Sequence, residues 1–205
     1  MLYLRVKRCL DIILSLIALI VLSPLFIALI IAIKVDSEGP VLFKQKRIGI
    51  YKSYFYILKF RTMRIDTPKD TPTHLLEKPE RWITRFGRFL RKTSLDELPQ
   101  IINILKGEMS IIGPRPALWN QFDLIEERDK YSANDVPVGL TGWAQINGRD
   151  ELPIEIKAKL DGEYVEKIGF LMDVKCFFGT IFSVLRSDGV VEGGTGMLDG
   201  ESVKK

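Results

Sequence analysis

The stretch Thr93-Ser94-Leu95-Asp96-Glu97-Leu98-Pro99-Gln100 organises the middle of the chain, because it joins a helix-start pattern to two adjacent carboxylates. Ser94 followed by Glu97 is a capping-box pattern, and Pro99 suits a first helical turn. The register stays open, since a helix capped by Ser94 places Pro99 slightly deep in that turn. In either register Asp96 and Glu97 lie near a helix N-terminus, where the dipole favours anions. Taken alone, the stretch is more typical of capping than of catalysis.

Helical patterns flank the two carboxylates. Residues 81–92 predict a basic amphipathic helix, which suits a membrane surface and equally suits packing against a core. Residues 100–106 predict a second helix, which Gly107 stops. The first helix has apolar and cationic sides, made by Trp82, Ile83, Phe86, Phe89 and Leu90 and by Arg81, Arg85, Arg88, Arg91 and Lys92.

An almost unbroken apolar run covers residues 12–33. It is long enough to span a bilayer, and it is too long for a signal peptide and lacks a cleavage site. Ser23-Pro24 lies at its middle, where proline weakens the helix and Ser23 can bond a freed carbonyl. Both flanks are basic, and positive residues mark the cytoplasmic side. We expect a helix-break-helix that enters one leaflet and returns; a kinked membrane-spanning helix is the close alternative.

Two strand-like segments, residues 41–43 and 54–62, surround a turn at Gly49 and predict a short β-hairpin. Lys59 and Arg61 share one face of the second strand by the period of two. Two neighbouring cations on a strand can hold a diphosphate, although solvated edge charges are the more usual case.

Arg115 lies between two prolines in Gly113-Pro114-Arg115-Pro116. The prolines fix the backbone, so a phosphate clamp at Arg115 would lose little entropy on binding. A plain proline-rich turn with an exposed arginine is the alternative.

Residues 138–149, VGLTGWAQINGR, predict a loop that resembles a nucleotide-diphosphate pocket. Glycines allow close backbone approach, Gln145 and Asn147 can read a base edge, and Arg149 can pair with phosphate. The loop is neither a Walker A loop nor a Rossmann fingerprint, so general motif rules support it weakly. Further helices are predicted over residues 117–134, 151–168 and 170–185, followed by a loose tail.

Composition excludes several functional classes. The 205 residues carry a net charge of +4, which suits nucleic acid, phosphorylated ligands or an anionic membrane. No stripe of stacking aromatics accompanies the cations, which disfavours nucleic acid as a partner. Cys9 and Cys176 lie far apart, which argues against structural zinc and for a reducing compartment. His74 is the sole histidine; it lies in a polar loop and rules out a Ser-His-Asp triad unless that loop folds back.

Taken together, these stretches resemble the small monotopic phosphoglycosyl transferases of the bacterial sugar transferase family. The matching stretches occur in order over nearly the whole chain, and together they are highly specific although each alone is modest. Larger relatives carry extra N-terminal spanning helices, so this chain resembles the core-only form. The matches are the apolar segment with Ser23-Pro24, KFRTM at 59–63, SLDELPQ at 94–100, GPRP at 113–116 and GLTGWAQINGR at 139–149.

The resemblance implies that a sugar-1-phosphate passes from a UDP-sugar to undecaprenyl phosphate with release of UMP, which initiates bacterial glycoconjugate synthesis. It implies Mg2+ and a covalent intermediate, with Asp96 as nucleophile and Glu97 as its partner in metal binding or proton transfer. Cations and a metal would neutralise the donor diphosphate. The expected substrate-binding residues are Lys59, Arg61, Arg115, Gln145, Asn147 and Arg149.

The expected architecture is a mostly helical α+β fold. A re-entrant membrane helix over residues 1–35 would precede a catalytic domain over 36–190 and a tail over 191–205, with the catalytic domain at the cytoplasmic face of the bacterial inner membrane. A membrane-anchored scaffold without activity is the alternative; it explains the apolar run but gives the Asp-Glu pair no role. A glycosidase fits poorly, because its carboxylates must flank a sugar ~5 Å or more apart.

Overall fold

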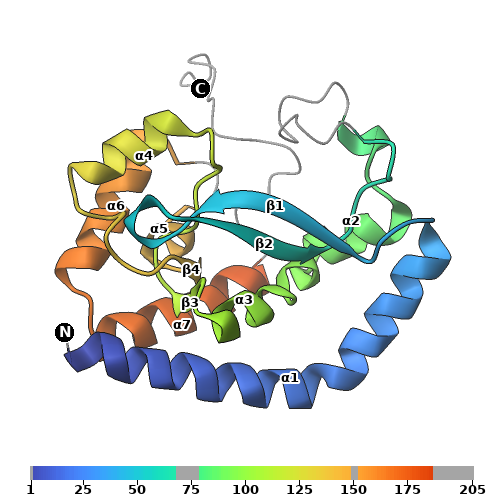
Figure 1. Cartoon of the computed structure of the whole chain (residues 1–205), viewed down its shortest axis with the longest axis horizontal. Helices are drawn as coiled ribbons and strands as arrows, with labels where there is room; N and C mark the ends of the chain where they lie inside the picture. Colours follow the sequence, from blue (N-terminus) through green and yellow to red (C-terminus); the bar gives the residue numbers. More distant parts are fainter. Residues whose placement is uncertain (1, 68–78, 149–151, 187–205) are drawn as a thin grey trace.

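The computed structural model describes residues 2–67, 79–148 and 152–186 (Figure 1). A long helix, α1 (Leu2–Asp36), runs along one side of the molecule. An antiparallel hairpin of β1 (Leu42–Ile48) and β2 (Tyr54–Phe60) crosses the middle. Helix α3 (Gln100–Lys106) contacts both α1 and β2, and therefore lies between them. The described residues form the mostly helical α+β fold that the sequence predicts.

The other elements complete two groups around the hairpin. They are η1 (Ile50–Lys52), η3 (Pro79–Arg81), α2 (Arg85–Lys92), η4 (Leu95–Glu97), β3 (Ser110–Ile112), α4 (Phe122–Asp129), β4 (Gly139–Thr141), α5 (Trp143–Ile146), α6 (Ile154–Glu166) and α7 (Phe170–Arg186). Helix α2 lies at one end of the hairpin, whereas α4 and α6 lie together at the other end (Figure 1). Strands β3 and β4 pair in parallel below the hairpin in this view.

Helix α1 is one continuous helix and not two helices separated by a break. It is long and apolar enough to cross a membrane, and only 11% of its most apolar window is buried. Figure 1 shows that it bends partway along. Pro24 lies inside it, and the Ser23 hydroxyl donates to the Ile20 carbonyl at 2.8 Å. A proline removes one amide hydrogen, and a serine can satisfy a freed carbonyl, so a helix can bend at such a site without ending.

The two halves of α1 face the protein with different chemistry. In the first half the buried side chains are polar and lie one turn apart, at Lys7, Asp11 and Ser15. In the second half they are apolar, at Leu29 and Ile33, where they join a cluster with side chains of β2 and α2. Most large apolar side chains of α1 point away from the protein. The N-terminal half of α1 therefore packs on the protein through polar side chains and the C-terminal half through apolar ones, while the apolar outer side of the helix stays exposed.

The predicted hairpin forms, with Leu42 opposite Phe60 and Ile48 opposite Tyr54. Its first strand continues to Ile48, well beyond the predicted 41–43, and its second ends at Phe60, two residues early. Helix α3 lies along the outer edge of β2. Its Asn103 side chain is fully buried; Oδ1 accepts from the Leu58 amide at 2.9 Å, and Nδ2 donates to the Tyr56 carbonyl at 2.8 Å. One side-chain amide thus satisfies the backbone groups that a third strand would otherwise bond.

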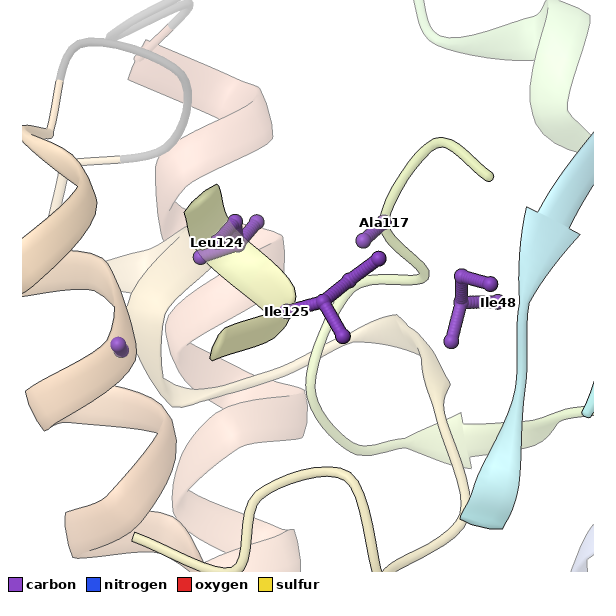
Figure 2. Close-up of a cluster of buried hydrophobic side chains, with 5 residues drawn as sticks. Ile48, Ala117, Leu124 and Ile125 are labelled. Atoms are coloured by element: carbon purple, nitrogen blue, oxygen red, sulfur yellow. The ribbon is translucent and has the colours of Figure 1, made fainter. Parts of the chain in front are cut away.

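Helix α4 packs against the hairpin through a small apolar cluster. Figure 2 shows Ile48 of β1 facing Ala117 and Ile125. The helix predicted over residues 117–134 is shorter than expected and covers only α4. Its expected first turn is instead extended, because the Ile48 amide donates to the Ala117 carbonyl at 3.0 Å and Leu118 bridges to Arg47. The cluster comprises Ile48, Ala117, Leu124, Ile125 and Ala158.

The segment predicted as a loop over residues 138–149 is ordered secondary structure up to residue 146. It contains β4, which pairs in parallel with β3, and the short helix α5. The glycines in this segment favoured the loop prediction, but in the structure they permit close packing of the backbone. A Cβ on Gly142 would lie 2.1 Å from the Gly113 carbonyl oxygen, so only glycine fits there without a shift. The two segments that follow β3 and β4 therefore lie against each other.

Candidate active site

The two carboxylates lie in a tight turn between α2 and α3, and the predicted Ser94 cap is absent. Ser94 has a left-handed backbone, with φ of 56°, and its side chain makes no capping bond. Asp96 and Glu97 fall in the 3-10 turn η4, and α3 begins only after Pro99. The chain reverses at once after α2, where the Ser94 amide donates to the Arg91 carbonyl at 3.1 Å, and this geometry overrides the capping pattern. The carboxylates precede the helix rather than start it.

Glu97 is the centre of a three-residue ionic cluster. Its Oε1 accepts from Lys59 Nζ at 2.8 Å and from Arg115 Nη2 at 2.5 Å, and its Oε2 accepts from Arg115 Nη1 at 3.3 Å. The side chains of Glu97 and Lys59 are 17% and 18% exposed, and that of Arg115 is 34% exposed. The cluster, which we call the Glu97 clamp, brings together the η4 turn, β2 and the segment after β3, and it stays partly exposed to solvent.

The adjacent carboxylates have opposite electrostatic environments. Burial alone would raise the pKa of Glu97, but Arg115 and Lys59 outweigh it and hold that pKa well below its usual range. For Asp96, burial raises the pKa; Lys59 opposes the rise and Glu97 adds to it. Glu97 is therefore a fixed anion that holds two cations, whereas the charge of Asp96 is costly until further positive charge arrives.

Backbone bonds hold the Arg115 segment in place on both sides. The Gly113 amide donates to the Thr141 carbonyl at 2.8 Å, and the Gly139 amide donates to the Pro114 carbonyl at 2.9 Å. These bonds tie the segment that follows β3 to both ends of β4, up to the residue before Arg115. The arginine therefore projects from a backbone that its neighbouring prolines and β4 both restrain.

Gln145 lies beside this segment. Its side chain is buried, and neither Oε1 nor Nε2 has a hydrogen-bond partner in the part of the chain that the structure describes. Oε1 lies 3.1 Å from the position a Cβ on Gly142 would take. Asn147 is different, because its Nδ2 donates to the Trp143 carbonyl at 2.7 Å. Arg149 lies outside the described residues.

Arg61 is not part of the Glu97 clamp, although the sequence predicts it on one strand face with Lys59; β2 ends at Phe60, before Arg61. Its guanidinium is buried and donates to the Glu38 carbonyl, to the Ser37 carbonyl at 2.6 Å and to the Ser37 hydroxyl at 3.0 Å. These acceptors belong to the turn that follows α1. Arg61 therefore fixes the exit of α1.

Two further residues at this site were not among the predicted site residues. Arg91, at the end of α2, lowers the pKa of Asp96, and its Nε donates to the Thr62 hydroxyl at 2.9 Å. Gln100 is 1% exposed, and both polar atoms of its side chain lack a hydrogen-bond partner among the described residues. A usable signal exists for Arg91, since it lies five positions before Asp96, although the pattern of residues 81–92 itself predicts only that Arg91 belongs to the cationic side of an amphipathic helix.

The geometry fits a metal ion that is only partly coordinated by protein. Within the described ranges, no three His, Cys, Asp or Glu side chains gather into a metal site. Mg2+ is commonly held by one or two carboxylates together with water and substrate phosphates. Asp96 suits such a role better than Glu97, whose oxygens already bond Lys59 and Arg115.

Comparison with known proteins places this arrangement in a family. A family model described as bacterial sugar transferase matches residues 2–187. The chain is 39% identical over 184 residues to the uncharacterized sugar transferase EpsL of Bacillus subtilis (strain 168), covering 90% of this chain and 89% of that protein.

Two longer relatives carry more specific names. A UDP-glucose:undecaprenyl-phosphate glucose-1-phosphate transferase of Xanthomonas campestris pv. campestris is 40% identical over 186 residues, 87% of this chain. A protein of the same name from Escherichia coli (strain K12) is 39% identical over 183 residues, 86% of this chain. The chain spans only 38% and 39% of these two proteins. The family match nevertheless covers nearly all of this sequence, and the chain belongs to the bacterial sugar transferase family.

Proposed function

We propose that this protein transfers a sugar-1-phosphate from a UDP-sugar to undecaprenyl phosphate, as a phosphoglycosyl transferase. The observation that carries the proposal is the Glu97 clamp beside Asp96. It places two partly exposed cations next to a carboxylate, which suits attack on a diphosphate. The names of the Xanthomonas and Escherichia relatives support the acceptor and the type of donor.

In the proposed reaction, a carboxylate oxygen of Asp96 attacks the phosphorus that bears the sugar. The bond from that phosphorus to the oxygen of UMP breaks, and UMP leaves with the electron pair. A phosphate oxygen of undecaprenyl phosphate then attacks the same phosphorus and releases the Asp96 carboxylate. Two steps replace one difficult transfer, and one site serves a soluble donor and a lipid acceptor in turn.

Lys59, Arg115 and Gln145 have complementary roles in this scheme. The donor diphosphate repels a carboxylate nucleophile, so the two cations must share their charge with it. Glu97 holds both cations at the site before the donor arrives. Gln145 offers an unpartnered buried amide beside the Arg115 segment, which suits a polar group of the donor. Arg149 remains a proposed ligand, as the sequence predicts.

Mg2+ is proposed as the cofactor, held by Asp96 with Glu97 near by. When bound, it would neutralise charge on the diphosphate and on the leaving UMP. It would also favour the ionised form of Asp96, whose pKa burial raises.

Both ends of α1 contact the same domain, which supports a re-entrant membrane helix. Near the start, Arg8 Nη2 donates to the Leu105 carbonyl at 2.8 Å. At the end, the Asp36 carboxylate accepts from the Phe86 amide at 3.4 Å. A straight spanning helix would place its ends on opposite sides of a hydrocarbon core ~30 Å thick. We therefore propose that α1 enters and leaves the bilayer on the cytoplasmic face, where the catalytic domain meets the soluble donor.

Cysteine labelling tests this topology. Single cysteines replace Leu2 or Ser37 in a chain that lacks Cys9 and Cys176. An impermeant maleimide added outside intact cells should label neither position, and both should react once the cells are opened. Labelling of the Leu2→Cys position from outside would contradict the re-entrant arrangement.

The reaction itself is tested without the acceptor. The purified protein is incubated with a UDP-sugar and Mg2+ but no polyprenyl phosphate, and modified peptides are mapped by mass spectrometry. A phosphosugar on the Asp96 peptide, with one UMP released per enzyme, is expected. An adduct found only on Glu97 would reverse the proposed roles. Absence of UMP release from every UDP-sugar, with and without acceptor, would favour a non-enzymatic scaffold.

A further inference from the structure

A mostly buried polar cluster joins α1 to α6 and α7 beside β3. Its centre is Asp173, near the start of α7. The Tyr3 hydroxyl and the Lys7 ammonium lie 2.7 and 2.5 Å from Oδ2, and the Tyr164 hydroxyl donates to Oδ1 at 2.7 Å. The side chains of Lys7 and Asp173 are only 5% and 12% exposed. One carboxylate therefore ties three helices together.

The same cluster reaches the backbone of β3. Tyr164 is 1% exposed, and its hydroxyl lies 3.4 Å from the Ile112 carbonyl oxygen. On α1, one turn beyond Lys7, the buried Asp11 accepts from the Ile111 amide at 3.0 Å. Strand β3 is thus held by α1 directly and by α1 through Asp173 and Tyr164.

Strand β3 leads directly to the Glu97 clamp. Ile112 is followed by the restrained segment Gly113-Pro114-Arg115, and Arg115 bonds Glu97. Residues 113–115 are too few and too restrained to absorb a displacement of β3, so Arg115 would move with the strand. The seating of α1 and the position of the Arg115 guanidinium are therefore mechanically linked.

We propose that Asp173 is a positioning residue for the reaction, because it seats the first half of α1 against β3 and so places Arg115 at Glu97. The membrane helix then does more than anchor the domain, since a site that has lost this docking is misaligned. The kinetic consequences rest on the proposed function, whereas the docking of α1 on β3 does not.

Charge balance makes the proposal testable by a pair of substitutions. Asp173→Asn keeps the shape but leaves the buried Lys7 ammonium without its anion, and an unpaired buried charge is strongly unfavourable. Lys7→Met together with Asp173→Asn removes both charges. The double variant should therefore seat α1 better than Asp173→Asn alone. Lys52→Met is the matched control, because Lys52 forms an exposed ion pair with Asp129 at 2.6 Å.

The kinetic test uses the full-length protein in lipid nanodiscs with a UDP-sugar and polyprenyl phosphate. Asp173→Asn should lower kcat/KM by about tenfold, the loss of roughly one hydrogen bond to the donor, mainly through a higher KM for the UDP-sugar. In the double variant, kcat/KM should be within about threefold of the wild-type value, because the second substitution removes the charge that the first left unpaired. A smaller folded fraction would lower only kcat. An unchanged KM in Asp173→Asn would therefore overturn the positioning role.

Hydrogen exchange tests the docking without any turnover. In Asp173→Asn, amides in residues 3–11 and 108–116 should exchange faster than in wild type, whereas those of α4 should not. In the control variant Lys52→Met, residues 3–11 and 108–116 should exchange as in wild type. Unchanged exchange over residues 108–116 would refute the link from Asp173 to β3. If wild type released no UMP at all, the proposed function would fail while this measurement still decided the docking.

Discussion

Asp161 and Glu97 each bond an arginine, and their surroundings give them different functions. Asp161 of α6 accepts from Arg128 of α4 at 2.8 and 2.5 Å, and the two side chains are 0% and 3% exposed. Glu97 bonds both Arg115 and Lys59 and stays partly open. The sealed pair has one charge of each sign and can only hold two helices together. The open clamp holds surplus positive charge that an incoming phosphate can share, so removing charge should cost stability at the first site and activity at the second.

The largest effect is expected beside the open clamp, for Asp96→Asn. Loss of the nucleophile should lower kcat by more than ~10³-fold. Because burial raises the folded-state pKa of Asp96, its charge at pH 7 opposes folding, and the neutral amide should leave the melting temperature unchanged or higher. Steady-state UMP release and calorimetry measure the two effects. Full turnover by this variant would remove Asp96 from the reaction.

At the sealed pair, Arg128→Ala should cost about 3–5 kcal/mol of the free energy of unfolding, because Asp161 is left as an unpaired buried charge. Urea denaturation measures the loss, and activity per folded molecule should change little. Arg128→Met with Asp161→Leu should recover most of the stability, since an apolar pair can replace a buried ion pair. A large fall in kcat/KM with normal stability would contradict the structural role.

For the open clamp, Arg115→Ala should reverse this pattern. Loss of a charge-assisted bond to the donor costs about 1.5–3 kcal/mol, which corresponds to roughly tenfold to a hundredfold in kcat/KM. Stability should change less than in Arg128→Ala. Arg64→Ala is the control, because Arg64 pairs with Asp66 on the exposed surface at 3.1 Å. Wild-type kinetics for Arg115→Ala would place the diphosphate elsewhere.

The smallest effect is expected at the exposed pair Lys52–Asp129. Lys52→Met breaks the contact with Asp129, whose side chain is 44% exposed. Such pairs contribute about 0–1 kcal/mol, and salt screens them. The change in the free energy of unfolding should therefore be near zero at high salt. If Lys52→Met lowered the free energy of unfolding as much as Arg128→Ala, burial would not explain the difference in stability between the two ion pairs.

Local patterns predicted the elements whose cause is local. The hairpin follows from strand-like runs, and α3 ends at Gly107, which has the left-handed φ of 86° that favours glycine. The predicted cap at Ser94 was wrong, because the reversal after α2 set the backbone there. The predicted loop was wrong over residues 139–141 and 143–146, which form β4 and α5. Its glycines serve close packing against the segment after β3, and a single sequence does not display that contact.

The candidate site shows the same division between local and distant causes. The adjacency of Asp96 and Glu97 and the restraint on Arg115 were readable from their neighbours in sequence. The partners were not, since Lys59 lies 38 positions before Glu97 and reaches it only after the hairpin has formed. Arg61 shows where prediction from spacing fails. Its position two residues after Lys59 predicted a shared ligand, but in the structure it bonds the turn after α1.

The Asn103 side chain has a consequence beyond the fold of one molecule. A two-stranded sheet presents unpaired amides and carbonyls that another chain can extend, and such open edges promote aggregation. By bonding both Tyr56 and Leu58, Asn103 occupies this edge of β2 as a built-in terminator of the sheet. In the proposed membrane-bound state, copies of this protein are concentrated in two dimensions and meet often. There, one buried amide keeps the hairpin from recruiting strands of neighbouring molecules.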